Sequence, residues 1–273
     1  MSELVGITST NYAGRPIKTS QVFFAMLRRD LRVARRELPF FLLRTMMQPL
    51  MLMIVFGYLL PKLGMMQGNY TTTLLPGVLA LSIALSAVQS IALPMVAQFG
   101  FSREIEDRLL APIPVHLVAA ELVVAATIQG VLAGLVVLPA GRLIMGPIPG
   151  LEITNVVQIL AVTTIGAAAF SALGLFLGCA IQPQQIGLLF STIVGPMIFF
   201  GCTYYPWAAL SKVPALQYAV LLNPLVYVAE GLRGALTPGL PHMNMLVVTG
   251  ALAVLLGVFW TMGLRGFMRR AVG

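Results

Sequence analysis

Residues 63–102 read LGMMQGNYTTTLLPGVLALSIALSAVQSIALPMVAQFGFS, and none of these forty residues is Asp, Glu, Lys or Arg. A transmembrane helix needs about 20 consecutive, mostly apolar residues to cross a hydrocarbon core of about 30 Å. The stretch has room for one such helix, which we expect at about 74–99, after the polar residues 67–73. It therefore indicates an integral membrane protein.

Other uncharged stretches of 20, 59 and 31 residues lie at 122–141, 153–211 and 234–264. The longest has room for two spans, separated by the polar, proline-containing residues 182–185. One more apolar stretch precedes Lys62. The sequence predicts an all-α integral membrane protein with six transmembrane helices, at about 40–60, 74–99, 116–139, 154–181, 186–203 and 244–264.

The composition excludes the common soluble classes. Hydrophobic residues make up 58% of the chain and charged residues only 10%, whereas an average soluble domain carries about 25% charged residues. The 17 Lys and Arg residues exceed the 9 Asp and Glu residues, which gives a formal net charge of +8. We attribute this excess to the cytoplasmic loops of a membrane protein rather than to a nucleic-acid partner. Soluble enzymes, nucleic-acid modules, disordered chains and disulfide scaffolds are excluded.

The distribution of the positive charges predicts the orientation. If both chain ends lie in the cytoplasm, 13 Lys and Arg residues fall inside and 4 fall outside. The positive-inside rule then favours an N-in, C-in topology. No signal peptide is expected, because the first twenty residues lack an apolar core. We expect a cytoplasmic N-terminus with an interfacial helix at 1–39 and a six-helix transmembrane domain at 40–273.

The segment before the first span has the pattern of an amphipathic helix. Its apolar residues recur at intervals of three and four, which places them on one helical face: Phe24, Leu27, Leu31, Ala34 and Leu38. Its arginines occupy the other side: Arg28, Arg32, Arg35 and Arg36. Such a helix lies in the membrane interface, where the arginines meet anionic lipid headgroups, and Pro39 ends it. A solvated helix attached to another domain is the alternative.

Residues 101–115 (FSREIEDRLLAPIPV) form the first predicted cytoplasmic loop. Ser102 can cap a short helix, acidic residues favour its N-terminal end, and Pro112 and Pro114 end it. A turn between adjacent spans needs only a few residues, so we expect a short charged helix that a soluble partner moves. A solvated turn is the alternative. The candidate coupling residues are Arg103, Glu104, Glu106, Asp107, Arg108, Leu109 and Leu110.

The segment 204–236 is too apolar for a plain loop before the last span. Residues 216–222 are too few to cross a membrane, and a second short helix follows Asn223 and Pro224. We expect two re-entrant helices on the extracytoplasmic side that cap an exit, and a surface hairpin is the alternative. The residues of interest are Asn223, Pro224, Glu230 and Arg233, of which the last two can pair at i, i+3. The candidate outer gate is aromatic: Phe199, Phe200, Tyr204 and Tyr205.

No catalytic or metal site is expected in this chain. His116 and His242 fall on opposite sides of the membrane, and neither has a thiol nearby in the sequence. Cys179 and Cys202 are expected near opposite membrane faces, too far apart for a disulfide. The chain also lacks the GxxxxGK[ST] motif that cradles nucleotide phosphates. ATP and Mg²⁺ would therefore have to be bound by another polypeptide.

Several motifs, taken in order, resemble the membrane subunit of ABC-2 type exporters, a family that includes daunorubicin-type drug permeases and nodulation and polysaccharide exporters. Each motif is short, but together they extend over nearly the whole chain. They are QPL at 48–50 with VFG at 55–57, LPG at 75–77, RE and LLAPIP within 103–114, YP at 205–206 and LNPLVYVAEGLR at 222–233.

The resemblance implies a non-catalytic permease of the bacterial inner membrane. Two separate ATPase subunits would bind ATP and Mg²⁺ and move the coupling loop, and a second permease, identical or homologous, would complete the pathway. Because the spans are nearly uncharged, we expect an amphipathic drug or a lipid-like substrate. The alternatives are a polysaccharide or lipo-oligosaccharide exporter and, from a different class, an ion-coupled secondary transporter.

Overall fold

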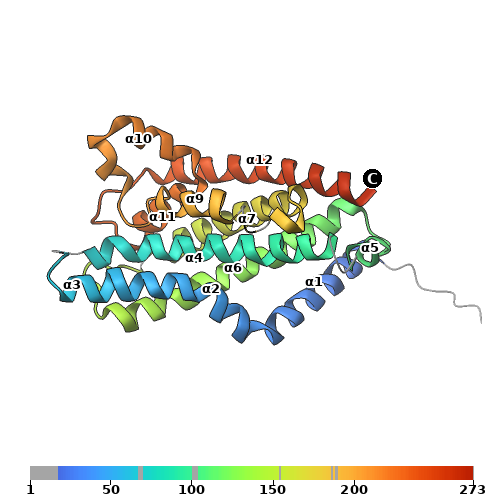
Figure 1. The fold of residues 1–273 in the computed structure, drawn as a ribbon, viewed down its shortest axis with the longest axis horizontal. Coiled ribbons are helices and arrows are strands. Elements are labelled where there is room, and N and C mark those ends of the chain that lie inside the picture. Colours follow the sequence, from blue (N-terminus) through green and yellow to red (C-terminus); the bar gives the residue numbers. More distant parts are fainter. Residues whose placement is uncertain are drawn as a thin grey trace, which may run out of the picture.

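The computed structural model describes residues 18–66, 70–99, 104–153, 155–185, 187 and 190–272, and within these ranges the chain forms helices and no strands. The prediction of an all-α protein is thereby confirmed for the described part of the chain. Its four longest apolar helices run alongside one another (Figure 1), and each is long and apolar enough to cross a membrane: α4 (Tyr70–Ala97), α6 (Val115–Met145), α7 (Val156–Ala180) and α12 (Met245–Val272).

These four helices correspond to the predicted spans at 74–99, 116–139, 154–181 and 244–264. A bent pair of shorter helical segments, 214–222 and 224–236, would add a fifth span if it crosses the membrane as one unit. Helix α7 ends at Ala180, and the 3₁₀ turn η3 (Pro183–Gln185) lies at the predicted break.

The two other predicted spans are not single α-helices. The chain at 40–60 runs through α2 (Leu38–Leu52), the π-helical η1 (Met53–Leu59) and α3 (Leu60–Lys62). The chain at 186–203 contains the π-helical η4 (Phe190–Val194) and α9 (Gly195–Phe199). Proline inside α2 and at the start of α9 removes backbone donors there and favours such irregular helix. The count of six spans stays a prediction.

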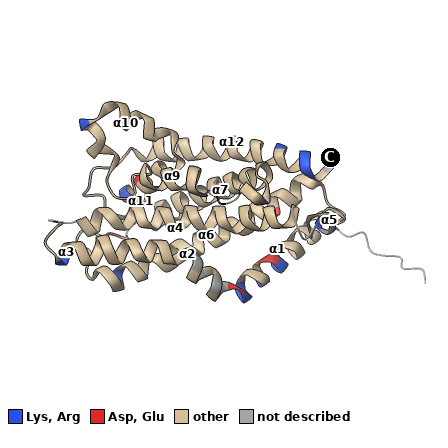
Figure 2. Ribbon diagram, in the orientation of Figure 1, with Lys and Arg blue, Asp and Glu red and all other residues tan. Residues whose placement is uncertain are grey.

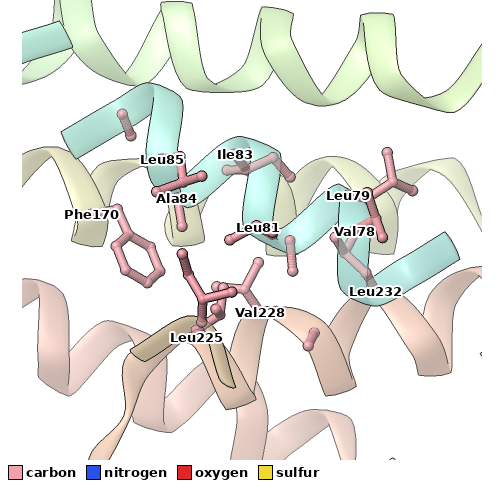
Figure 3. Packing of buried hydrophobic residues seen from close by; sticks show 14 of the residues in the cluster. Val78, Leu79, Leu81, Ile83, Ala84, Leu85, Phe170, Leu225, Val228 and Leu232 are labelled. Carbon is pink, nitrogen blue, oxygen red and sulfur yellow. The ribbon is translucent and has the colours of Figure 1, made fainter. Parts of the chain in front are cut away.

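Helix α4 forms the centre of the bundle. Twenty of its 28 residues are buried, and it packs against α6, α7 and α11 (Pro224–Leu236). Glycines let α6 and α7 pack close to α4, because a side chain at these positions would crowd it. A Cβ added at Gly130 of α6 would lie 3.1 Å from Ala87, and a Cβ added at Gly178 of α7 would lie 2.9 Å from Met95. Figure 3 shows the apolar side chains between these helices, including Phe170 and Leu225.

Helix α1 (Thr19–Arg36) runs obliquely to the bundle, from beside α5 to the bend before α2 (Figure 1); it contacts α6, and none of its residues is buried. Helix α1 ends at Arg36 and the chain bends at Glu37, so Leu38 and Pro39 begin α2, whereas the sequence predicted that the first helix includes Leu38 and ends at Pro39. The side chain of Phe24 is 65% exposed, and the four predicted interfacial arginines (Arg28, Arg32, Arg35 and Arg36) are exposed as well. Leu27, Leu31 and Ala34 of the predicted apolar face are half-buried, and the placement of this helix in the membrane interface stays a prediction.

Charged residues gather at the two ends of the bundle and leave its middle almost uncharged (Figure 2). At one end lie α1, α5 (Glu104–Leu109) and the C-terminal end of α12 (Figure 1). At the other end lie η5 (Trp207–Lys212), α10 (Pro214–Ala219), η6 (Val220–Leu222) and the short helix α3. We call the first the inner end and the second the outer end, following the predicted orientation.

Candidate functional site

The short helix α5 is held against the inner end of the bundle by one face. Ile105 and Arg108, three residues apart and therefore on the same side of a helix, are buried. Ile105 belongs to an apolar cluster that also contains Val118 of α6 and Phe267 of α12. Directly after α5, the side chain of Leu110 is 83% exposed. The structure thus gives this loop a fixed inward face and at least one projecting apolar side chain.

Arg108 binds two carboxylates that come from two other helices. Its Nη1 donates a hydrogen bond to Oδ2 of Asp30 at 2.8 Å, and its Nη2 donates to Oδ1 at 3.0 Å. Nη1 also donates to Oε2 of Glu121 at 3.4 Å. The bidentate contact with Asp30 is a strong, directional form of ion pair. These three residues, which we call the inner ion triad, fasten α5 to α1 and α6.

The structure describes three of the seven predicted coupling side chains. Arg108 is only 8% exposed, so its contacts lie within the chain rather than on a surface open to a partner. Leu109 is half-buried and Leu110 exposed. Arg103 lies outside the described residues, and so do the side chains of Glu104, Glu106 and Asp107. Their assignment to partner contact stays a prediction.

Sequence reasoning did not find the two carboxylate partners of Arg108. Asp30 is the one acidic residue in α1, on a helix whose other charges are all arginine. Glu121 is completely buried in α6, in the first two turns of a helix that is otherwise strongly apolar. Burying a lone carboxyl group is costly unless it has a polar partner or stays protonated. An isolated acidic residue in an apolar helix was therefore the signal that could have indicated a partner elsewhere in the chain.

At the outer end, Glu230 and Arg233 of α11 form the ion pair predicted from their spacing, and both side chains are completely buried. The carboxylate of Glu230 also accepts two backbone hydrogen bonds. Its Oε1 accepts from the N–H of Trp207 at 2.8 Å, and its Oε2 accepts from the N–H of Met243 at 3.1 Å. Glu230 therefore connects α11 to the start of η5 and to the segment before α12.

Arg233 connects the same helix to two further segments. Its Nη2 donates to the backbone carbonyl oxygens of Cys202 at 3.1 Å and of Thr73 at 3.3 Å. Cys202 has a left-handed backbone, with φ at 53°, a conformation that costs free energy in a non-glycine residue. Next to it, a Cβ added at Gly77 of α4 would collide with the backbone carbonyl of Thr203. We call Glu230 and Arg233 the outer ion pair.

The predicted gate aromatics gather around the end of α9. The ring of Tyr204 lies 6.3 Å from that of Phe199 and 5.5 Å from that of Phe56, measured between centroids. The hydroxyl of Tyr205 donates to the backbone carbonyl of Phe199 at 3.0 Å. Burial raises the pKa of the Tyr204 hydroxyl, so this group stays a neutral phenol. Phe200 instead faces a cavity.

That cavity is an open groove between α7, α9, α10 and α12 with a volume of about 620 Å³, and exposed side chains such as Leu222 form part of its lining. Its lining is mostly apolar, with Phe200 and Phe259 among the aromatic side chains. Asn223 and Pro224 reach it from the start of α11. The Asn223 side chain also accepts a hydrogen bond from the N–H of Leu225 at 3.0 Å, and so caps that helix.

The cysteines and possible metal ligands do not form a further site among the described residues. Cys179 and Cys202 are both buried free thiols. Among the described residues, no group of three His, Cys, Asp or Glu side chains is placed to hold a metal ion. The two ends of the bundle are thus where the described residues bury charged side chains, whereas buried hydroxyl groups such as those of Ser86 and Ser171 lie between them.

Comparison with known proteins gives a consistent result. A family model described as ABC-2 type transporter matches residues 21–237, which include α5, the inner ion triad and the outer ion pair. The inner membrane transport permease YadH of Escherichia coli strain K12 is 28% identical over 212 residues, which cover 76% of this chain and 79% of YadH. The permease of the same name from Shigella flexneri matches equally well. No solved structure gives a significant match.

Proposed function

Because the chain belongs to the ABC-2 type transporter family, we propose that it forms the pathway of an exporter for an amphipathic drug or a lipid-like substrate. The family membership makes it a transmembrane transport permease, and it lies in the bacterial inner membrane as a multi-pass protein. In the proposed assembly, two separate ATPase subunits bind ATP and Mg²⁺. A second permease, either the same chain or a homologue, completes the pathway.

The observation that carries this proposal is the attachment of α5. A lever must be joined firmly to what it moves, and Arg108 joins α5 to both α1 and α6 through charge-assisted hydrogen bonds. An ATPase that pushes on this loop would displace the inner ends of those two helices together. Leu110, exposed at the end of α5, offers the apolar contact for that push.

The apolar cavity at the outer half supports the proposed substrate class. Its volume of about 620 Å³ falls within the range of roughly 300–1,000 Å³ that is usual for sites of drug-sized ligands. Among apolar side chains, its lining contains the hydroxyl of Thr192 and the amide of Asn223, and that amide already makes hydrogen bonds to Met197 and Leu225. Such a lining suits an amphipathic molecule better than a highly hydrated polymer. The aromatic cluster around Tyr204 lies beside it and is the proposed outer gate.

The coupling assignment is tested with the double variant Glu104→Lys/Asp107→Lys. The permease is purified with its candidate ATPase and reconstituted into vesicles, and ATP hydrolysis and export of a fluorescent lipid are measured together. We expect the variant to insert normally and to hydrolyse ATP while export is lost. Glu152→Lys, an exposed charge reversal at the outer end, serves as the control. Normal export by the double variant would refute the lever.

The substrate class is tested with the same vesicles. Drugs, phospholipids and lipid-linked saccharides are added in turn, and the stimulation of ATP hydrolysis is compared. We expect amphipathic drugs or lipids to stimulate. Stimulation by lipid-linked saccharides alone would replace the proposed substrate with a polysaccharide, and it would leave the permease assignment intact.

A further inference from the structure

A second cavity, of about 250 Å³, lies at the inner end between α1, α4 and α6. It adjoins the inner ion triad, because Asp30 and Arg108 form part of its wall. Unlike the outer cavity, it has a lining that is about half polar. The polar side chains that matter below are Arg29, Glu37, Ser90, Gln98 and Gln129.

We propose that this cavity binds the headgroup of a zwitterionic aminophospholipid, whose acyl chains extend into the bilayer. Its volume is below the range of roughly 300–1,000 Å³ typical of sites that enclose whole drug-sized ligands, so it suits part of a larger molecule. One wall is α1, whose amphipathic pattern places it at the depth of lipid headgroups. The lining also contains apolar side chains such as Val33 and Leu122, which would contact the glycerol and upper acyl carbons.

The charges around this cavity favour a headgroup without net charge. Two arginines, Arg29 and Arg108, and two carboxylates, Asp30 and Glu37, line the cavity. A third carboxylate, that of Glu121, contacts Arg108 from outside the lining, so the arginines give no net positive charge to attract an anion. Asp30 and Arg108 already neutralise each other through their bidentate contact. An anionic headgroup would be attracted by Arg29 and repelled by Glu37. In an ammonium–phosphate headgroup, the phosphate can contact Arg29 while the ammonium contacts Glu37, so both interactions are favourable.

The hydrogen-bonding groups on the wall also match such a headgroup. Gln129 accepts a hydrogen bond from Ser90 Oγ at 3.1 Å through its Oε1; within the described residues its NH₂ group has no acceptor, and the amide of Gln98 has no partner. Pro94, which also lines the cavity, has no N–H, so the carbonyl of Ser90 lacks its usual helical donor. The wall thus supplies donors for a phosphate and acceptors for a primary ammonium group.

The test needs no ATPase, so it is independent of the proposed transport function. The purified chain is placed in phosphatidylcholine nanodiscs that contain phosphatidylethanolamine carrying a photoactivatable diazirine near the ester. Crosslinked peptides are identified by mass spectrometry. We expect labelling to concentrate in α1 and in the inner halves of α4 and α6. The corresponding phosphatidylglycerol probe is expected to label these peptides about tenfold less, the equivalent of about 1.4 kcal/mol in affinity.

Two variants assign the labelling to the cavity. Ala34→Phe fills it from α1, and Ala25→Phe makes the same change at an exposed position of the same helix outside the cavity. Gln129→Leu removes the amide without adding a large side chain, and it covers the case in which Ala34→Phe displaces α1. We expect Ala34→Phe and Gln129→Leu to lose the labelling and Ala25→Phe to keep it. Equal labelling in all variants, or equal labelling by the anionic probe, would overturn the proposal.

Discussion

The two ends of the bundle both bury an arginine, but they hold it in different ways. At the outer end, Arg233 and its partner Glu230 lie on one helix, and their remaining hydrogen bonds go to backbone groups of four other segments. At the inner end, the hydrogen bonds of Arg108 seen among the described residues go to side chains, one on α1 and one on α6. The outer pair is completely buried, whereas the side chain of Asp30 is 15% exposed.

This difference indicates different mechanical roles. A charged pair that also satisfies backbone groups cannot separate without leaving several buried polar groups unpaired, which is costly. The outer ion pair therefore acts as a fixed brace for the aromatic cluster and the turn at Cys202. The contact between Arg108 and Asp30 can open toward water at lower cost, because Asp30 is already partly solvated. The inner ion triad thus joins α5 to α1 and α6 less rigidly than the outer ion pair joins its own segments.

The largest predicted loss of stability comes from removing one partner of the outer ion pair. Glu230→Ala leaves Arg233 buried without its carboxylate and removes the acceptor of two backbone N–H groups. We expect a loss of about 3–5 kcal/mol in the free energy of unfolding, measured by thermal unfolding in mild detergent. Glu152→Ala, at an exposed position, controls for loss of a carboxylate. Equal stability of the two variants would show that the outer ion pair is not a brace.

Breaking the inner ion triad is expected to lower the free energy of unfolding by less than breaking the outer ion pair. Arg108→Met leaves Glu121 buried without a cation, while Asp30 turns to solvent, and we expect a loss of about 2–3 kcal/mol. Adding Glu121→Gln should recover part of this loss, because the orphaned charge is then removed. Thermal unfolding of the single and double variants checks this order, with the exposed Arg142→Met as control. A double variant less stable than the single one would contradict the triad.

A smaller effect tests how tightly the outer region is packed. Gly77→Ala places a methyl group against the backbone carbonyl of Thr203, and a backbone atom cannot move aside as a flexible side chain can. We expect a loss of about 1–2 kcal/mol from overpacking. Gly257→Ala in α12 is the matched control, because nothing lies within 4 Å of its added Cβ, and it should gain up to about 1 kcal/mol from helix propensity. The comparison uses unfolding midpoints of both variants.

The sequence predicted contacts within one helix but not contacts between helices. The pairing of Glu230 with Arg233 follows from helical spacing, and the start of α11 follows from an asparagine cap before proline. Both are local. The carbonyl of Thr73, 160 residues from Arg233, and the carboxylate of Asp30, 78 residues from Arg108, become partners only through helix packing. No spacing rule reaches that far.

The predicted spans show the same limit. Long apolar stretches such as α4 and α12 were found because length and hydropathy suffice to identify them. At 40–60 and 186–203 the composition is equally apolar, but the backbone changes between α- and π-helix. Hydropathy contains no signal for that change, since it depends on which hydrogen bonds the packed helix forms.

The smallest effect on stability is expected at the exposed end of the lever, together with a clear effect on coupling. Leu110→Ala removes an exposed side chain, so the free energy of unfolding should change by less than about 0.5 kcal/mol. If Leu110 is a central contact of the ATPase, its truncation should weaken the complex about tenfold, which corresponds to about 1.4 kcal/mol. Affinity measured on immobilised permease checks this, with Leu143→Ala, 86% exposed at the outer end of α6, as control. Equal affinity of both variants would show that Leu110 is not part of the coupling surface. No described residue would then be assigned to the contact through which the ATPase moves α5.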